Sequence, residues 1–236
     1  MSEVTIVIPV YNEGENIGEC LRQIHSQVKV PYCSLVVYDF DEDNSIPVVL
    51  QLQQESPEIP VKLLKNNLGR GVINAIKMGL KAAESSYVVV TMADLSDPPS
   101  VINHMMDVAK SENSDIVCGS RYMKGGKQYG GPLLKKVLSR VAGVSLYFMT
   151  SLPTHDVTNS FKLYKKTVLD AFTIESEGGF EIGMELVVKA HFNGFKVSEV
   201  PTEWTDRIAG ESNFKLFKWL PNYLKWYFYS LKKNWM

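Results

Sequence analysis

The first half of the chain alternates short apolar runs with segments in which apolar residues recur every three or four positions. Short apolar runs bounded by polar turns predict buried strands, and the longer spacing predicts helices that bury one face. This alternation predicts βαβ units, and therefore an α/β fold with a mostly parallel central sheet flanked by helices. The expected strands are Val4–Val10, Ser34–Tyr38, Val61–Leu64, Tyr87–Met92 and Asp115–Cys118, and the expected helices are Glu15–Gln27, Ile46–Gln54, Gly71–Glu84 and Ser100–Ser111.

The second half is less regular. Lys124–Gly131 is rich in glycine and is expected to form a mobile loop. Helices are expected at Pro132–Met149 and Phe180–Phe192, a polar loop at Ser151–Ser160, and strands at Phe161–Tyr164 and Lys196–Val200. The tail Phe214–Trp235 is expected to be helical, with Pro221 dividing it into two pieces. We therefore predict one domain over residues 1–212 and a basic, aromatic and amphipathic helical segment over residues 213–236.

Composition narrows the class of protein. The chain has 236 residues, of which 45% are hydrophobic, so it can bury a sizeable core. Its net charge of −1 argues against a nucleic-acid binder. The three cysteines are unevenly spaced and are expected to be reduced core residues of a cytosolic protein. The sequence shows no apolar leader and no apolar run near the length of a membrane span, so neither is expected. Oligomeric state stays open, and a homo-oligomer is compatible with the sequence.

The end of the fourth expected strand carries the sharpest chemical signal. The run Tyr87–Met92 is followed by Asp94, Ser96 and Asp97, and then by two prolines. Open α/β sheets bind ligands at the carboxyl ends of their strands. Carboxylates and a hydroxyl are hard oxygen ligands, which suit Mg²⁺ or Mn²⁺ bridging a diphosphate. The competing interpretation is an aspartate that caps a helix beside a solvated turn.

Three other strand ends carry polar groups at the same expected edge. The first strand ends with Pro9, Tyr11 and Glu13, and the second is followed by the acidic loop Asp39–Asp43. The third leads into Asn66–Gly71, a turn that enters a helix. Each feature has an ordinary structural explanation on its own, but the joint pattern favours a site for a nucleotide or a phosphate.

With these motifs in view, the sequence resembles the family 2 inverting glycosyltransferases with the GT-A fold, in particular the branch of polyprenyl-phosphate (dolichol-phosphate) sugar synthases. The resemblance covers residues 4–213. The matching stretches are Val7–Glu13, Val36–Asp39, Asn67–Gly71, Ala93–Pro99, Gly119–Tyr122 and Glu199–Arg207 with Gly210–Ser212. On this resemblance, residues 1–212 form a GT-A glycosyltransferase domain.

The resemblance implies a role for each matching residue. A nucleoside-diphosphate sugar would be bound by Pro9, Tyr11, Glu13, Asp39, Asp41, Gly69, Arg70, Ala93, Asp94 and Ser96. A divalent Mg²⁺ or Mn²⁺ would be held by Asp94 with Ser96, and Asp97 is a candidate to assist Asp94 because the family's first carboxylate is missing. Arg121 and Arg207 would clamp phosphates, and Ser212 and Lys215 would help to bind the acceptor phosphate. Asp94, Arg121 and Arg207 are the implied catalytic residues.

The chain departs from the family pattern at three places. The family's metal motif is Asp-any-Asp, whereas this chain has Met92-Ala93-Asp94. The family's Asp-Asp-Gly-Ser loop is Asp39-Phe40-Asp41-Glu42, so that Asp41 is a candidate to replace a missing contact. The lysine that the family has near the end of the match is replaced by Asn213, with Lys215 two positions later. A catalytically impaired homologue that only binds sugar nucleotides therefore stays open.

The acceptor is predicted from what the chain lacks. A hydroxyl acceptor needs a general base, and the family's usual motif for that base is incomplete at Ile182–Leu186. A phosphate is already anionic, so a polyprenyl phosphate is the favoured acceptor. The alternative is a sugar hydroxyl in cell-surface polysaccharide synthesis, with Glu181 or Glu185 as base.

The tail supports a lipid acceptor. From Asn213 to the end it has no acidic residue and combines lysines with many aromatic residues. Such a helix suits a bilayer interface, and the alternative is a helix packed on the sheet or on a second subunit. We therefore expect a cytoplasmic enzyme, peripheral at the inner face of the membrane.

Overall fold

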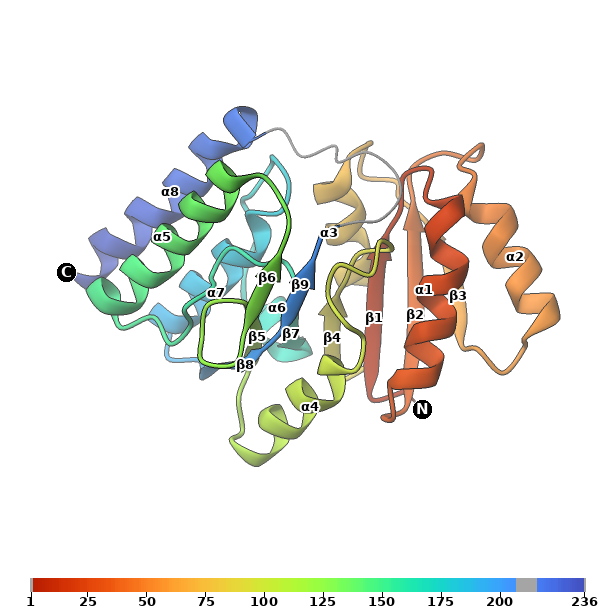
Figure 1. Cartoon of the computed structure of the whole chain (residues 1–236), viewed down its shortest axis with the longest axis horizontal. Helices are drawn as coiled ribbons and strands as arrows, with labels where there is room; N and C mark the ends of the chain where they lie inside the picture. Colours follow the sequence, from red (N-terminus) through yellow and green to blue (C-terminus); the bar gives the residue numbers. More distant parts are fainter. Residues whose placement is uncertain (1, 207–215, 236) are drawn as a thin grey trace.

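The structure, a computed structural model, describes residues 2–206 and 216–235. Its main sheet has seven strands in the order β3-β2-β1-β4-β7-β5-β8 (Figure 1). Strands β3, β2, β1 and β4 are mutually parallel, β7 is antiparallel to both of its neighbours, and β8 is parallel to β5. The prediction of a mostly parallel α/β sheet is confirmed. The strands are β1 Val4–Pro9, β2 Tyr32–Tyr38, β3 Val61–Lys65, β4 Tyr87–Val90, β5 Ile116–Ser120, β7 Lys162–Lys165 and β8 Val197–Pro201.

Helices cover both faces of this sheet. They are α1 Gly14–Gln27, α2 Ser45–Glu55, α3 Val72–Ala82, α4 Val101–Ser111, α5 Leu133–Thr150, α6 Lys166–Ala171, α7 Ile182–Phe192 and α8 Leu216–Asn234. Most agree with the predicted ranges to within two residues. The six-residue helix α6 was not predicted, because so short a segment shows too little periodicity.

Two hydrophobic clusters lie on opposite faces of the sheet. One combines the strands with α1, α2 and α4, and the other with α3, α7 and part of α8. Consecutive residues of β1 alternate between them, since Ile6 and Ile8 belong to the first cluster and Val7 to the second. A strand that is buried on both faces must be apolar at every position, which explains its unbroken apolar run.

The glycine-rich segment is more ordered than the sequence suggests. Residues Lys127–Tyr129 form strand β6, which pairs in parallel with β9, Glu203–Thr205, in a separate two-stranded sheet. The middle of the expected loop Lys124–Gly131 is therefore a strand. A Cβ on Gly126 would lie 2.3 Å from the carbonyl oxygen of Ser120, so the glycine allows this chain to turn back against β5.

The C-terminal helix α8 packs on α5 and α7 (Figure 1). Trp226 is 1% exposed, and its Nε1 donates a hydrogen bond to Ser176 Oγ at 3.0 Å. The prediction that Pro221 divides this segment is wrong, because α8 continues through it. Pro221 lies near the start of a long helix, so it removes one hydrogen bond that packing further along the helix offsets. Within the residues that the structure describes, no helix combines the length and apolar content needed to cross a bilayer.

Candidate functional site

The carboxyl ends of β1, β2 and β4 bring three predicted carboxylates to one edge of the sheet. These strands are parallel neighbours, and Glu13, Asp39 and Asp94 follow their ends. Two of these carboxylates lie close enough to the buried thiol of Cys20 on α1 to affect its pKa. Burial, and then the negative charges of Asp94 and Glu13, raise the pKa of Cys20 to about 12. Residues far apart in the sequence therefore converge on one acidic edge.

The loop after β1 is fixed to the loop after β2 by backbone donors. The N–H of Asn12 donates to Asp43 Oδ2 at 3.0 Å, and the N–H of Glu13 donates to Ser45 Oγ at 2.9 Å. Asp43 is 1% exposed and also accepts from the N–H of Ser45. Sequence reasoning placed Asp43 only within an acidic loop. Its separate function was not visible, because an acidic loop does not reveal which carboxylate points inward.

Asp39 fixes the turn between β3 and α3. Its Oδ1 accepts from Asn66 Nδ2 at 2.7 Å, and its Oδ2 accepts from the N–H of Gly71 at 2.8 Å. Asn66 Nδ2 also donates to the carbonyl of Gly69. Gly71 has φ +125°, a conformation that strains any residue with a side chain. Asp39 therefore holds the Gly69–Gly71 turn against the end of β2.

Asp41 lies outside this arrangement of hydrogen bonds. Its carboxylate is exposed and pairs with Lys65 Nζ at 2.5 Å. The expectation that Asp41 replaces a missing donor contact stays a prediction, and its ion pair with Lys65 provides a structural explanation for its charge.

Asp94 is oriented by the residue two positions later. Its Oδ1 accepts from the N–H of Ser96 at 3.1 Å and from Ser96 Oγ at 2.7 Å. Pro9 and Ala93, two further predicted donor-site residues, are buried at the same strand ends. No group of three or more metal-ligating side chains occurs among the described residues. One carboxylate with an adjacent hydroxyl still fits Mg²⁺ or Mn²⁺, because these ions take one or two carboxylates and complete their shell with substrate phosphates and water.

Asp97 occupies a different position from the one expected of a metal ligand. It is 8% exposed, and its Oδ1 accepts from Asn159 Nδ2 at 3.3 Å and from Thr202 Oγ1 at 3.1 Å. Burial raises the pKa of Asp97 to about 6, against the lowering effect of the nearby Arg121. The metal assignment of Asp97 stays a prediction, and the structure provides an alternative: its carboxylate anchors the loop after β4 through Asn159 and Thr202.

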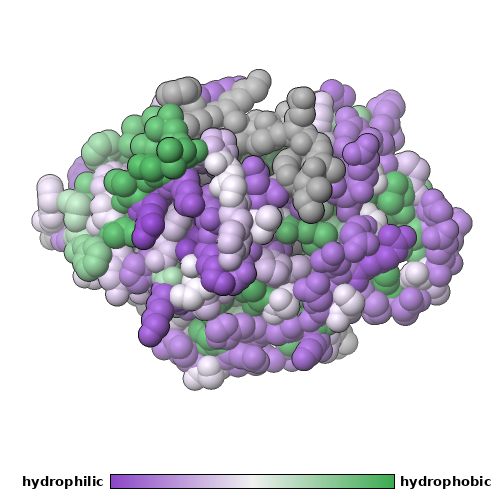
Figure 2. Space-filling view, in the orientation of Figure 1, coloured by the Kyte–Doolittle hydropathy of each residue, from purple (hydrophilic) through white to green (hydrophobic). Residues whose placement is uncertain are grey.

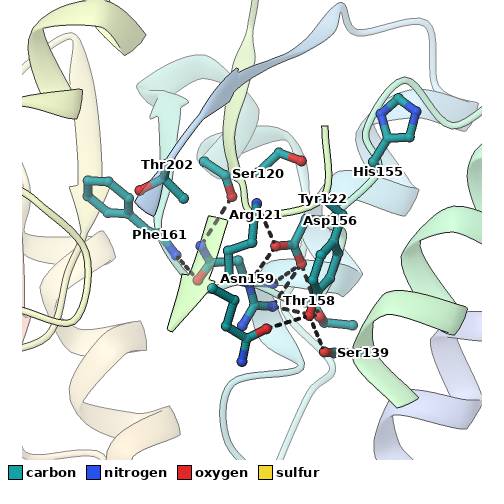
Figure 3. Close-up of polar contacts among 12 residues, drawn as sticks. Ser120, Arg121, Tyr122, Ser139, His155, Asp156, Thr158, Asn159, Phe161 and Thr202 are labelled. Atoms are coloured by element: carbon teal, nitrogen blue, oxygen red, sulfur yellow. Dashed lines mark hydrogen bonds and ion pairs between the residues drawn. The ribbon is translucent and has the colours of Figure 1, made fainter. Parts of the chain in front are cut away.

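Arg121, which was expected to clamp a phosphate, forms a buried ion pair, and its contact with a phosphate stays a prediction. It is 8% exposed and donates two parallel hydrogen bonds to Asp156, from Nε to Oδ2 at 2.6 Å and from Nη2 to Oδ1 at 2.9 Å. Figure 3 shows the two side chains facing each other, with Thr158 and Asn159 beside them. Burial opposes both charges, but the pair's mutual attraction raises the pKa of Arg121 and lowers that of Asp156. Nε and Nη2 of Arg121 are therefore committed to a buried ion pair.

The surrounding network includes residues that sequence reasoning missed. Asn159 Nδ2 donates to the carbonyl of Gly119 as well as to Asp97, and the Lys162 ammonium donates to the carbonyls of Val157 and Asn159. A polar residue in a loop gives no signal of burial, so Asp156 and Asn159 could not be distinguished within Ser151–Ser160.

Strand β9 brings the end of the first described segment to the loop after β4. The N–H of Thr205 donates to the carbonyl of Ser96 at 2.9 Å, and the N–H of Asp206 donates to the carbonyl of Tyr129 at 3.0 Å. The three remaining predicted residues, Arg207, Ser212 and Lys215, lie outside the described residues. The last described residue before them, Asp206, follows directly after the Thr205–Ser96 contact.

The fold is an α/β sheet with carboxylates at the carboxyl ends of neighbouring parallel strands, and comparison with known proteins gives the family. The family model for glycosyl transferase family 2 matches residues 5–173, so the chain belongs to this family.

Two relatives are similar over most of the chain. It is 33% identical over 217 residues to the dolichol-phosphate mannosyltransferase of Pyrococcus furiosus, with 90% of this chain and 59% of that protein aligned. It is 29% identical over 229 residues to the polyprenol monophosphomannose synthase of Mycolicibacterium smegmatis, with 91% and 85% aligned. The alignment therefore covers less than two thirds of the length of the Pyrococcus relative.

Solved structures confirm the fold. Glucosyl-3-phosphoglycerate synthase from Mycobacterium tuberculosis, in complex with Mn²⁺, UDP and glucosyl-3-phosphoglycerate, superposes with a TM-score of 0.69 at 13% identity, over 99% of this chain and 80% of that one. S. aureus TarS in complex with UDP-GlcNAc gives a TM-score of 0.60 at 18% identity, over 89% and 60%. The mostly parallel sheet flanked by helices is therefore the GT-A fold.

Proposed function

We propose that this protein transfers a hexose from a nucleoside-diphosphate sugar to the phosphate of a polyprenyl (dolichyl or undecaprenyl) phosphate, with inversion at the anomeric carbon. The observation that carries the proposal is the single sheet edge at which Glu13, Asp39 and Asp94 follow neighbouring parallel strands. The two relatives named for lipid-phosphate mannose transfer point to the same acceptor class.

At the donor end, Asp94 would hold a divalent cation, with its carboxylate oriented by Ser96. Mg²⁺ or Mn²⁺ bound there would neutralise the charge that develops on the departing nucleoside diphosphate. The Mycobacterium tuberculosis synthase of the same fold was solved with Mn²⁺ and UDP. Tyr11, Glu13, Asp39 and the Gly69–Arg70 turn would bind the nucleoside.

At the acceptor end, the described residues favour a phosphate over a hydroxyl. A hydroxyl acceptor needs a general base in contact with it. The two candidates, Glu181 and Glu185, are both 0% exposed. The Glu185 carboxylate accepts from the N–H groups of Glu175 and Ser176 and from Lys189 Nζ. A phosphate acceptor is already an anion and attacks the anomeric carbon without losing a proton to the protein.

The arginines have separate functions in this proposal. Arg121, through its pair with Asp156, holds the end of β5 against the loop 151–160. Asn159 of that loop bonds to both Asp156 and Asp97, which connects it to the loop after β4. Arg207, with Ser212 and Lys215, would contact the acceptor phosphate. Their part of the chain follows directly on Asp206, whose neighbour Thr205 is bonded to Ser96.

The proposed acceptor carries an isoprenoid chain, and helices α5 and α8 provide an apolar surface for a membrane. This apolar face is visible over α5 in the upper left of Figure 2. The two helices have no acidic residue and several lysines. Apolar residues among lysines suit the interface of an anionic bilayer, so we propose peripheral attachment at the cytoplasmic face. The apolar face consists of Leu133, Leu134, Val137, Val141, Phe148, Met149, Leu224, Phe228 and Trp235, all 40–76% exposed.

Membrane attachment predicts a specific result with lipid vesicles. Replacing Phe148 and Phe228 together with serine should lower co-sedimentation with vesicles of anionic lipid by about tenfold or more, because two large apolar side chains lose their insertion energy. Binding of the unaltered protein should weaken as salt concentration rises. Leu50→Ser, on the exposed face of α2, is the matched control and should bind like the wild type. Undiminished sedimentation of the Phe148→Ser/Phe228→Ser variant would count against this face.

Turnover separates the proposed function from its alternatives. The protein would be incubated with GDP- or UDP-hexoses, Mn²⁺ and a short polyprenyl phosphate, and lipid-linked sugar and free nucleoside diphosphate would be measured. Lipid-linked sugar supports the proposal. Transfer only to sugar hydroxyls favours a polysaccharide transferase, and donor binding with no nucleoside diphosphate above background identifies a binding protein without activity.

A further inference from the structure

Three side chains from three different strand ends form an exposed cluster at the outer part of the acidic edge. The rings of Tyr11 and Phe40 make an edge contact, with centroids 5.4 Å apart and planes at 63°. The guanidinium carbon of Arg70 lies 5.1 Å from the centroid of the Phe40 ring. Tyr11 is 54% exposed, Arg70 is exposed and Phe40 is half-buried. We call these three residues the stacking platform.

The loops that carry the stacking platform are bonded to one another. Two hydrogen bonds join the Tyr11 loop to the Phe40 loop: the N–H of Asn12 donates to Asp43, and the N–H of Glu13 donates to Ser45. The Arg70 turn is held to the Phe40 loop by Asp39, which accepts from the N–H of Gly71. The three side chains therefore share one rigid support, and presenting them to a ligand requires little ordering of the chain.

Phe40 is the residue of this cluster that the family pattern does not account for. The family loop has a second aspartate where this chain has Phe40, so a polar contact is replaced by an aromatic ring. A partly exposed ring that an arginine covers is poorly explained by core packing alone. Aromatic rings and guanidinium planes both stack on nucleobases.

Tyr11 and Arg70 already belong to the donor site proposed above. We propose that Phe40 extends this site: its ring offers the nucleobase a further flat surface and positions Arg70, so that Phe40 determines part of the affinity for the nucleoside. This inference rests on the proposed function, and it adds a residue that neither the family pattern nor the sequence motifs assign. Because stacking needs only a flat base, the contribution of Phe40 should be present for purine and pyrimidine alike.

Calorimetry with two nucleoside diphosphates and with pyrophosphate tests the inference. GDP, UDP and inorganic pyrophosphate would each be titrated into the full chain with Mn²⁺. Phe40→Leu keeps apolar bulk and removes the flat ring, so it should weaken binding of any nucleoside diphosphate that the wild type binds by at least about fivefold. Pyrophosphate has no base, so its affinity should stay within about twofold of the wild-type value. Phe40→Tyr retains a ring and should keep most of the nucleotide affinity.

The outcomes separate this inference from the proposed function. Leu50→Ala, an exposed apolar truncation on α2, should leave both affinities unchanged. If the wild type binds a nucleoside diphosphate and Phe40→Leu binds it equally well, the stacking platform is excluded while the proposed function stands. If Phe40→Leu loses pyrophosphate and nucleotide affinity in equal measure, its role is structural and the inference fails. A wild-type chain that binds no nucleoside diphosphate overturns the proposed function itself.

Discussion

Replacing Asp94 with alanine is expected to abolish metal-dependent binding of a nucleoside diphosphate and to lower turnover by about a hundredfold or more. Asp94 is the carboxylate that Ser96 orients at the end of β4, and Met92 stands where the family has a second acid. A diphosphate leaving group needs its charge neutralised, so losing this carboxylate removes the main ligand for the cation. Calorimetry with and without Mn²⁺ measures the effect directly.

Asp97 provides the matched control for Asp94. It lies three residues later but is buried, and Asn159 and Thr202 both donate to its Oδ1. An asparagine offers the same acceptor oxygen, so Asp97→Asn should retain metal-dependent binding. An Asp94→Ala protein whose Mn²⁺-dependent affinity equals that of the wild type would refute the metal assignment.

The altered metal motif can also be tested by gain of function. Met92→Asp restores the family's Asp-any-Asp pattern and adds a second hard ligand at the same strand end. We expect it to tighten Mn²⁺ binding in the presence of nucleoside diphosphate. Unchanged metal affinity in this variant would show that residue 92 does not face the cation.

Replacing Asp156 with alanine is expected to lower the free energy of unfolding by about 3–5 kcal/mol. The change leaves the Arg121 guanidinium buried without its bidentate partner, and an uncompensated buried charge is strongly destabilising. Thr158 and the N–H groups of Arg121 and Asn159 also lose their bonds to the carboxylate. Urea unfolding followed by circular dichroism measures the difference.

An ion pair on the surface serves as the comparison for the buried pair of Arg121 and Asp156. Lys110 and Glu3 pair at 2.7 Å with both side chains nearly half exposed, so Glu3→Ala should change stability by less than about 1 kcal/mol. The double variant Arg121→Met/Asp156→Leu removes both charges and should recover part of the loss. A loss for Asp156→Ala no larger than that for Glu3→Ala would show that the buried pair does not hold these loops together.

The amino-acid pattern predicted the α/β architecture because strands buried on both faces must be apolar throughout. The runs at Val4–Pro9 and Tyr87–Val90 are such strands, and each is bounded by clear turn residues. Helices such as α1 were recognisable because their buried residues, Ile17, Leu21 and Ile24, recur at helical spacing. The short elements β6, β9 and α6 were missed because three to six residues carry too little periodicity.

The sequence by itself determined which residues follow the strand ends. Since parallel strands place their carboxyl ends at one edge of the sheet, it also predicted that these residues lie at the same edge. That was enough to bring Glu13, Asp39 and Asp94 together. The inward or outward direction of each side chain was decided only by tertiary structure. Asp94 and Asp97 are near neighbours in the chain, yet Asp97 turns into a buried network with Asn159 and Thr202. Such a direction depends on donors 62 and 105 positions away, and no local pattern records them.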